Sequence, residues 1–151
     1  MTDVAQVFAD LVRYETRLYN TLNARLRSAH GLTTSQYEFL RAIGAHAGRC
    51  RVNDLAEEFA IAVGATSKSM DRLEAAGWID RRPNPDNRRS SLLALTEEGR
   101  RLVDAATPTF DEALRELLSD PLATDSLDHL AAALAHLRGG MERARIGRPA
   151  G

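Results

Sequence analysis

The chain has 151 residues and a formal net charge of −1, and hydrophobic residues make up 44% of it. This length suits one domain with its own core, and the composition is that of an ordinary globular protein. No apolar run approaches the roughly 20 residues that cross a bilayer, and the N-terminus lacks a secretory pattern, so we expect no membrane partner. Cys50 is the sole cysteine, which excludes an internal disulfide and favours a cytoplasmic setting.

Two helices are predicted in the N-terminal third of the chain. The first spans residues 3–28, ends at Gly31 and carries an apolar stripe of Val4, Phe8, Leu11, Leu18, Leu22 and Leu26. This stripe is long for one small domain, so part of it needs a partner to cover it. The second helix starts at a Thr33-x-x-Gln36 capping box and ends by Gly48.

A helix-turn-helix is predicted next. The segment "VNDLAEEFAI" (52–61) gives a short helix, for which we expect Asn53 or Asp54 to be the cap. The helix "VGATSKSMDRLEAAG" (63–77) has Met70, Leu73 and Ala76 on its apolar face. Its opposite face should contact base edges and phosphates of a DNA major groove, through Thr66, Ser67, Lys68 and Arg72.

A basic hairpin follows this helix pair. Two strand-like runs, "WIDRR" (78–82) and "SLLAL" (91–95), flank the turn-rich "PNPDNRRS" (83–90). Residues 81–91 hold four arginines and one aspartate, a local charge of +3 that leaves −4 for the rest. Charge alone is typical of a solvated turn. Helix, turn, helix and basic hairpin in this order indicate a winged helix, whose wing tip enters a DNA minor groove.

Two outer helices close the chain. Thr96 should cap the first of them, which bends at Pro108 and has the apolar face Leu102, Val103, Ala106, Phe110, Ala113, Leu114 and Leu117. The last helix shows a near-heptad seam of Leu127, Leu130, Leu134, Leu137 and Met141. Residues 143–151 form a basic, glycine-rich tail that we expect to be disordered.

Residues 31–99 resemble the MarR (multiple antibiotic resistance regulator) family of winged-helix transcription factors. The family pattern is Leu-Glu-x-x-Gly, two apolar residues, x-Arg, then Asp-x-Arg, five residues and Leu-Thr-x-x-Gly. It is matched by Leu73, Glu74, Gly77, Arg81, Asp86, Arg88, Leu95, Thr96 and Gly99. The flanking helices extend the resemblance over nearly the whole chain.

The resemblance implies a mainly α fold with a small β-hairpin. A winged helix-turn-helix DNA-binding domain (31–99) would be flanked by dimerisation helices (1–30 and 100–142), with the tail at 143–151. The implied protein is a homodimeric repressor bound to a palindromic operator whose half-sites lie roughly 34 Å apart. The family also implies release by a small aromatic or phenolic ligand.

The resemblance also implies roles for side chains of the wing and of a ligand cleft. By family position Arg88 is the wing arginine, with Asp86 either holding it or capping the turn, and the neighbouring Arg89 as its alternative. Arg81 is expected to pair with a phosphate or with Asp86. A cleft for an aryl carboxylate would use Arg13, Tyr14, Arg17, Tyr37 and Phe110, although core packing and surface arginines explain the same residues.

The sequence leaves two other functions open. Cys50 lies between Arg49 and Arg51, an electropositive setting that would suit a redox-sensing regulator. A winged helix that docks a protein is a second alternative, but the polar recognition face favours DNA. Because no phosphate loop, nucleophile elbow or carboxylate pair is present, we expect no enzyme, and scattered histidines predict no metal or other cofactor.

Overall fold

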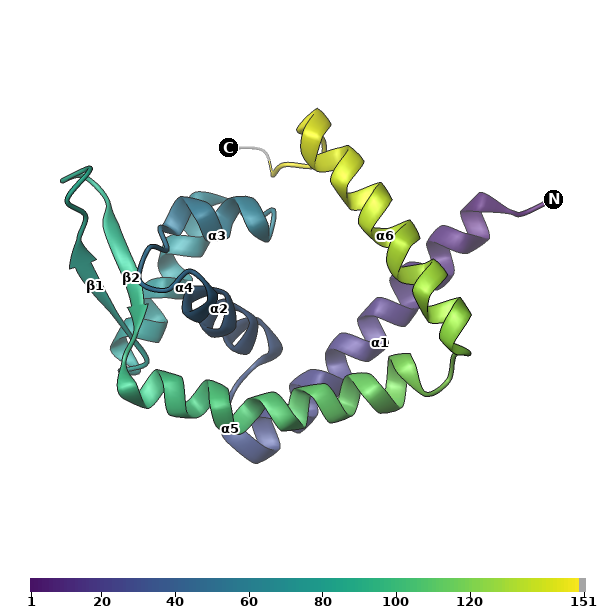
Figure 1. Cartoon of the computed structure of the whole chain (residues 1–151), viewed down its shortest axis with the longest axis horizontal. Helices are drawn as coiled ribbons and strands as arrows, with labels where there is room; N and C mark the ends of the chain where they lie inside the picture. The colour runs from purple at the N-terminus through teal and green to yellow at the C-terminus, as the bar shows by residue number, and fades with distance from the viewer. Residues whose placement is uncertain (150–151) are drawn as a thin grey trace.

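The structure, a computed structural model, describes residues 1–149. Its helices and strands form two regions joined by one long helix (Figure 1). The winged helix-turn-helix stands on one side, α1 and α6 cross on the other, and α5 runs between them. This confirms the mainly α fold with a small hairpin, in the order α1 (Val4–His30), α2 (Thr34–Ala45), α3 (Val52–Glu58), α4 (Val63–Ala75), β1 (Ile79–Pro83), β2 (Ser91–Leu95), α5 (Glu97–Leu114), the π-helical turn η1 (Arg115–Ser119) and α6 (Thr124–Ala144).

Most predicted helix boundaries are confirmed by their caps. Gly31 ends α1 at a left-handed φ of +69°, a conformation that costs glycine little. The Thr33 hydroxyl accepts from the Gln36 backbone N–H at 3.1 Å, and the Gln36 side chain accepts from Thr33 N–H at 2.9 Å. Thr96 caps α5 by accepting from Gly99 N–H at 3.0 Å. The helix then continues through Pro108 to Leu114.

The start of α3 differs from the prediction. Arg51, and neither Asn53 nor Asp54, is the residue that precedes the helix. Asp54 sits in the first turn, where its carboxylate accepts from the Arg51 backbone N–H at 2.9 Å and from the guanidinium at 2.7 Å. These hydrogen bonds from Arg51 lower the pKa of Asp54. The prediction missed this arrangement because arginine is not a usual cap residue, and the capping carboxylate of Asp54 lies inside the helix.

One core holds the winged helix against the outer helices. It gathers side chains from the C-terminal half of α1, from α2, α4 and the hairpin, and from the middle of α5, among them Leu26, Tyr37, Leu40, Leu73, Ile79 and Phe110. Of the α1 residues only Leu22 and Leu26 are buried. The N-terminal turns of α1 and the outer face of α6 therefore remain apolar and exposed.

The two strands form an antiparallel hairpin. Ile79 pairs with Leu95 at its base and Pro83 with Ser91 near its tip. A bridge between Cys50 and Leu93 adds a short third segment beside β2, where Leu93 N–H donates to the Cys50 carbonyl at 2.7 Å. The base of the wing is thus tied into the core, and the tip projects away from it (Figure 1).

The C-terminal segment is more structured than expected. Helix α6 passes through Gly139 and Gly140 to Ala144, two residues beyond the predicted end. Arg145 then turns the chain with a φ of +56°, and the Arg148 guanidinium pairs with the Glu57 carboxylate at 2.7 Å. The expected tail is corrected accordingly for residues 143–149, while residues 150–151 lie outside the described part. Across residues 1–149, no helix has the length and apolarity needed to cross a membrane.

Candidate nucleic-acid interface

Helix α4 follows α3 after a short turn and presents one face to solvent. Its buried face is formed by Thr66, Met70 and Leu73, spaced by four and three residues. Thr66 was predicted on the exposed face, and that placement is wrong. It is fully buried, and its hydroxyl donates to the Ala62 carbonyl at 3.0 Å. Thr66 lies four residues before the apolar Met70, and this spacing already indicates that it shares the buried face of the helix.

The other predicted residues of α4 are accessible. Lys68 and Arg72 are exposed and Ser67 is half-buried. Within residues 1–149, neither Lys68 nor Arg72 has a carboxylate within ion-pair distance. Two unpaired cations on one exposed helix face are suited to phosphates or to guanine edges in a major groove.

Arg81 ties the wing to α4 instead of reaching outward. Its guanidinium pairs with Asp71 at 2.8 Å and with Glu74 at 2.9 Å, and its side chain is only 24% exposed. The expected pairing with a phosphate or with Asp86 is therefore replaced by a link between β1 and α4. This link also neutralises two carboxylates that would otherwise repel a polyanion beside the recognition face.

The wing tip is shaped by two asparagines that the sequence reading did not single out. Asn84 is 8% exposed, its amide donates to the Ser90 hydroxyl at 2.9 Å, and its carbonyl oxygen accepts from Asp86 N–H at 3.0 Å. Asn87 accepts from Arg89 N–H at 3.0 Å. Asparagine side chains often accept from the backbone N–H two residues later, so the run "PNPDN" contained a local signal for these turns.

Asp86, Arg88 and Arg89 are all exposed at this tip. The predicted hydrogen bond from Arg88 to Asp86 does not form, and no ion pair of these three residues occurs in the described chain. The turn is held by its asparagines, so Asp86 is not needed as a cap. Both arginines remain available to a ligand of opposite charge.

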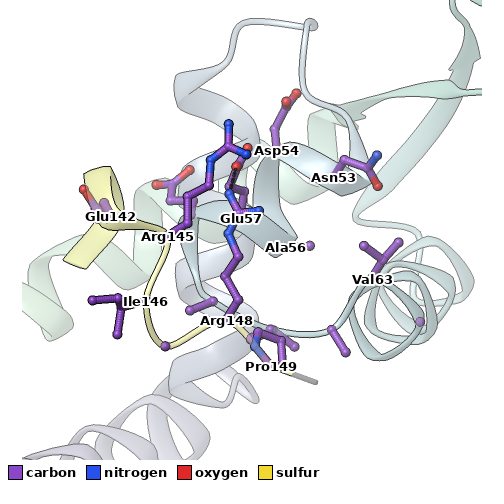
Figure 2. A pocket seen from close by; sticks show the side chains of 16 residues that line it. Asn53, Asp54, Ala56, Glu57, Val63, Glu142, Arg145, Ile146, Arg148 and Pro149 are labelled. Atoms are coloured by element: carbon purple, nitrogen blue, oxygen red, sulfur yellow. Dashed lines mark hydrogen bonds and ion pairs between the residues drawn. The ribbon is translucent and has the colours of Figure 1, made fainter. Parts of the chain in front are cut away.

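The five residues proposed for a ligand cleft are not gathered around one cavity. Tyr37 and Phe110 pack on each other in the core with ring centroids 4.6 Å apart. The Tyr14 hydroxyl donates to the Leu117 carbonyl at 2.8 Å, next to the π-helical turn. Arg13 and Arg17 are exposed on α1. A groove of about 960 Å³ lies elsewhere, between the α3–α4 turn and the C-terminal segment (Figure 2).

Cys50 has the opposite character from the one its neighbours suggested. The side chain is fully buried, and burial, with smaller contributions from Asp54 and Glu58, raises the pKa of the thiol to about 12. The nearby Arg51 acts in the opposite direction but is outweighed. A thiol with this pKa is almost entirely protonated near neutral pH, which removes the basis for a reactive cysteine.

This environment gives a direct prediction for thiol chemistry. Because three pKa units separate the thiol from its ordinary value of 9.0, the thiolate fraction at pH 7.5 is roughly a thousandfold lower. Alkylation of the folded protein by iodoacetamide should therefore be slower than that of the urea-unfolded chain by at least this factor. Equal rates in the two states, followed by mass spectrometry, would contradict the buried assignment.

Comparison with known proteins agrees with this geometry. The sequence profile of the MarR family matches residues 30–90, the winged helix up to the wing tip. The multiple antibiotic resistance protein MarR of Salmonella typhimurium is 29% identical over 96 residues, which are 64% of this chain and 66% of MarR. The winged-helix part of the chain, residues 30–90, matches the MarR family.

Two solved structures resemble this chain over most of its length. Sco3205, a MarR family transcriptional regulator from Streptomyces coelicolor in complex with DNA, superposes with a TM-score of 0.84 at 23% identity, over 93% of this chain and 94% of Sco3205. CouR from Rhodococcus jostii RHA1, bound to p-coumaroyl-CoA, gives a TM-score of 0.76 at 25% identity, over 84% and 87% of the two chains. The likeness to Sco3205 establishes the fold. None of these relatives is named as an enzyme, in agreement with the sequence reading.

Proposed function

We propose that this chain is a sequence-specific DNA-binding transcriptional regulator that acts as a homodimeric repressor. The observation that carries DNA binding is the joint exposure, on two neighbouring elements, of four cations without an ion pair in residues 1–149. They are Lys68 and Arg72 on α4 and Arg88 and Arg89 on the wing. The α4 carboxylates beside them are neutralised by Arg81. The DNA complex of Sco3205, which has the same fold, supports this use of the surface. Such a regulator would work in the cytoplasm.

Homodimer formation is proposed from the apolar surface left on the outer helices. On α1, Phe8 is 67% exposed, and on α6, Leu137 is 63% exposed. They lie in stripes that also include Val4, Val7, Leu11, Leu134 and Met141. Contiguous apolar surface of this kind marks a protein interface. A two-fold dimer would present two α4 helices to half-sites roughly 34 Å apart on a palindrome.

Removal of the Arg88 guanidinium tests the wing. Arg88→Ala should weaken binding to a selected duplex by about 1–3 kcal/mol and leave the melting temperature unchanged, because the side chain is exposed and its guanidinium has no ion pair within residues 1–149. Fluorescence anisotropy titration measures the loss. Arg101→Ala on α5 also removes an exposed arginine, one that pairs with Glu97, and should bind as the wild type does. Equal affinities of the two variants would contradict a wing contact.

The proposed regulator responds to a small aromatic or phenolic effector. Its support is the pair of exposed arginines on α1, Arg13 and Arg17, and the ligand-bound structure of CouR. Tyr37 and Phe110 would join such a site only if the core opened between α2 and α5. Salicylate added to the protein–DNA complex should release the DNA, and retention of the complex at millimolar salicylate would exclude this ligand class.

Neither of the two alternative functions fits the structure. Redox sensing through Cys50 conflicts with the burial of its thiol. A protein-docking role for the winged helix would require an apolar outer face on α4, whereas the centre of that face carries Lys68 and Arg72. DNA binding is therefore the function that the surface favours.

A further inference from the structure

Residues 145–149, which we call the C-terminal strap, leave the end of α6 and reach the helix-turn-helix (Figure 1, Figure 2). Arg145 has a left-handed φ of +56°, and the Ile146 backbone N–H donates to the Met141 carbonyl at 3.0 Å. Gly147 then adopts a φ of +79°, a conformation that favours glycine. These turns direct the strap away from the axis of α6 and along the groove beside the α3–α4 turn.

One ion pair joins the strap to the helix-turn-helix. The Arg148 guanidinium lies 2.7 Å from the Glu57 carboxylate of α3. In the chain as described, residues 1–149, no other side-chain hydrogen bond or ion pair connects residues 120–149 with the winged helix. Arg148 and Glu57 are 54% and 71% exposed, so solvent and salt reach this link.

The strap is not part of the core. The groove beside it is only partly filled, since its apolar side chains Ile61, Val63 and Ile146 are 36%, 52% and 60% exposed. Among the described residues, the hydrophobic core includes none after Leu114. The strap can therefore detach from α3 without disrupting the core of the winged helix.

We propose that the strap is a releasable link that fixes the winged helix relative to α6 and thereby sets the half-site spacing at which the dimer binds. This proposal rests on the proposed homodimeric DNA binding and adds a determinant of spacing to it. Helix α6 carries apolar surface proposed for the dimer interface, and α4 carries the recognition face. A rotation of the winged helix against α6 changes the distance between the two α4 helices of a dimer, and the closed strap opposes this rotation.

The exposure of the ion pair limits the size of the effect. An exposed pair shifts an equilibrium between closed and open strap by at most about fivefold. A duplex with the preferred spacing selects the closed state, whereas a lengthened duplex needs the open state, so the ratio of the two affinities reports the closed fraction.

Glu57→Gln tests the link without changing the strap itself. Wild type and variant are titrated with a selected palindrome and with the same palindrome lengthened by one base pair at its centre. The preference for the shorter duplex should fall by about two- to fivefold in the variant. Loss of one carboxylate changes the electrostatic attraction to both duplexes alike, so the ratio is free of that effect.

Trypsin cleavage after Arg145 measures strap opening without DNA. The cleaved bond lies inside the strap and has the same sequence in wild type and Glu57→Gln. Because cleavage of a transiently opened segment follows the population of the open form, the variant should be cleaved about two- to fivefold faster. Mass spectrometry of the truncated chain follows the reaction.

Two further variants control for charge. Glu97→Gln removes a carboxylate that is 75% exposed and pairs with Arg101, and it should keep the wild-type spacing preference and cleavage rate. Glu57→Arg combined with Arg148→Glu restores a pair of reversed polarity at the wild-type net charge. This double variant should regain the spacing preference that either change alone reduces.

The outcomes separate this proposal from the function on which it rests. An unchanged spacing preference in Glu57→Gln would overturn the role of the strap and leave DNA binding intact. An unchanged cleavage rate would overturn it as well, because the ion pair would then not hold the strap. Failure of the wild type to bind any duplex would contradict the proposed function and the role in spacing together, while the cleavage rates would still report whether the ion pair closes the strap.

Discussion

Leu137→Asp should convert the protein to a monomer and reduce binding to a palindromic duplex by at least about a hundredfold. The affected stripe on α6 includes Leu134, Leu137 and Met141, which are 41%, 63% and 49% exposed. A carboxylate buried in an apolar interface without a partner costs several kcal/mol, more than an interface of ordinary strength tolerates. Loss of the dimer leaves each chain with one half-site, so most of the binding free energy disappears.

Sedimentation velocity and anisotropy titration measure the two effects on the same sample. Ala132→Asp is the matched control, because it places the same charge on α6 two residues before Leu134 and therefore on roughly the opposite side of the helix. This variant should remain dimeric and bind DNA. If Leu137→Asp sediments as the wild type does, α6 is not part of the interface.

Gly99→Ala should destabilise the fold by about 3 kcal/mol, the upper end for an overpacked site. A Cβ at this position would lie 2.0 Å from the carbonyl oxygen of Trp78, and the obstacle is backbone that cannot rotate away. Thr96 fixes the same junction, because its hydroxyl donates to the Gly77 carbonyl at 2.6 Å and accepts from Gly99 N–H. The start of α5 would have to separate from the base of the wing.

Gly140→Ala provides the comparison for this glycine. It lies inside α6 with no atom within 4 Å of a built Cβ, so alanine should favour the helix by up to ~1 kcal/mol. Urea unfolding followed by circular dichroism gives both free energies. A Gly99→Ala variant as stable as the wild type would mean that the contact between α5 and Trp78 is not as close as described.

Local patterns in the sequence predicted the elements that depend on neighbouring residues. Gly31 and the Thr33–Gln36 capping box act within a few residues, and both are found where expected. The spacing of Met70 and Leu73 placed α4 correctly because a helix repeats its buried face every three or four residues. The order of helix, turn, helix and basic hairpin then indicated a winged helix, and the MarR-family motif agreed with it.

The errors concern side chains whose partners are distant or compete. Arg81 had several carboxylates within reach, and only the packing of β1 beside α4 selects Asp71 and Glu74. Cys50 has arginines on either side in sequence, yet its thiol is fully buried, and burial with Asp54 and Glu58 outweighs the effect of Arg51 on its pKa. Thr66 has a polar side chain, but its hydroxyl donates to the Ala62 carbonyl one turn earlier, and this hydrogen bond allows the residue to pack in the core.

The stoichiometry and salt dependence of binding to a selected palindromic duplex test the central claim most directly. Two chains should bind each duplex, and the logarithm of the association constant should fall with the logarithm of salt concentration with a slope of roughly −7 if all eight exposed cations, four from each chain, contact phosphates. One chain per duplex, or an affinity that does not change with salt, would contradict a dimer that grips DNA through Lys68, Arg72, Arg88 and Arg89.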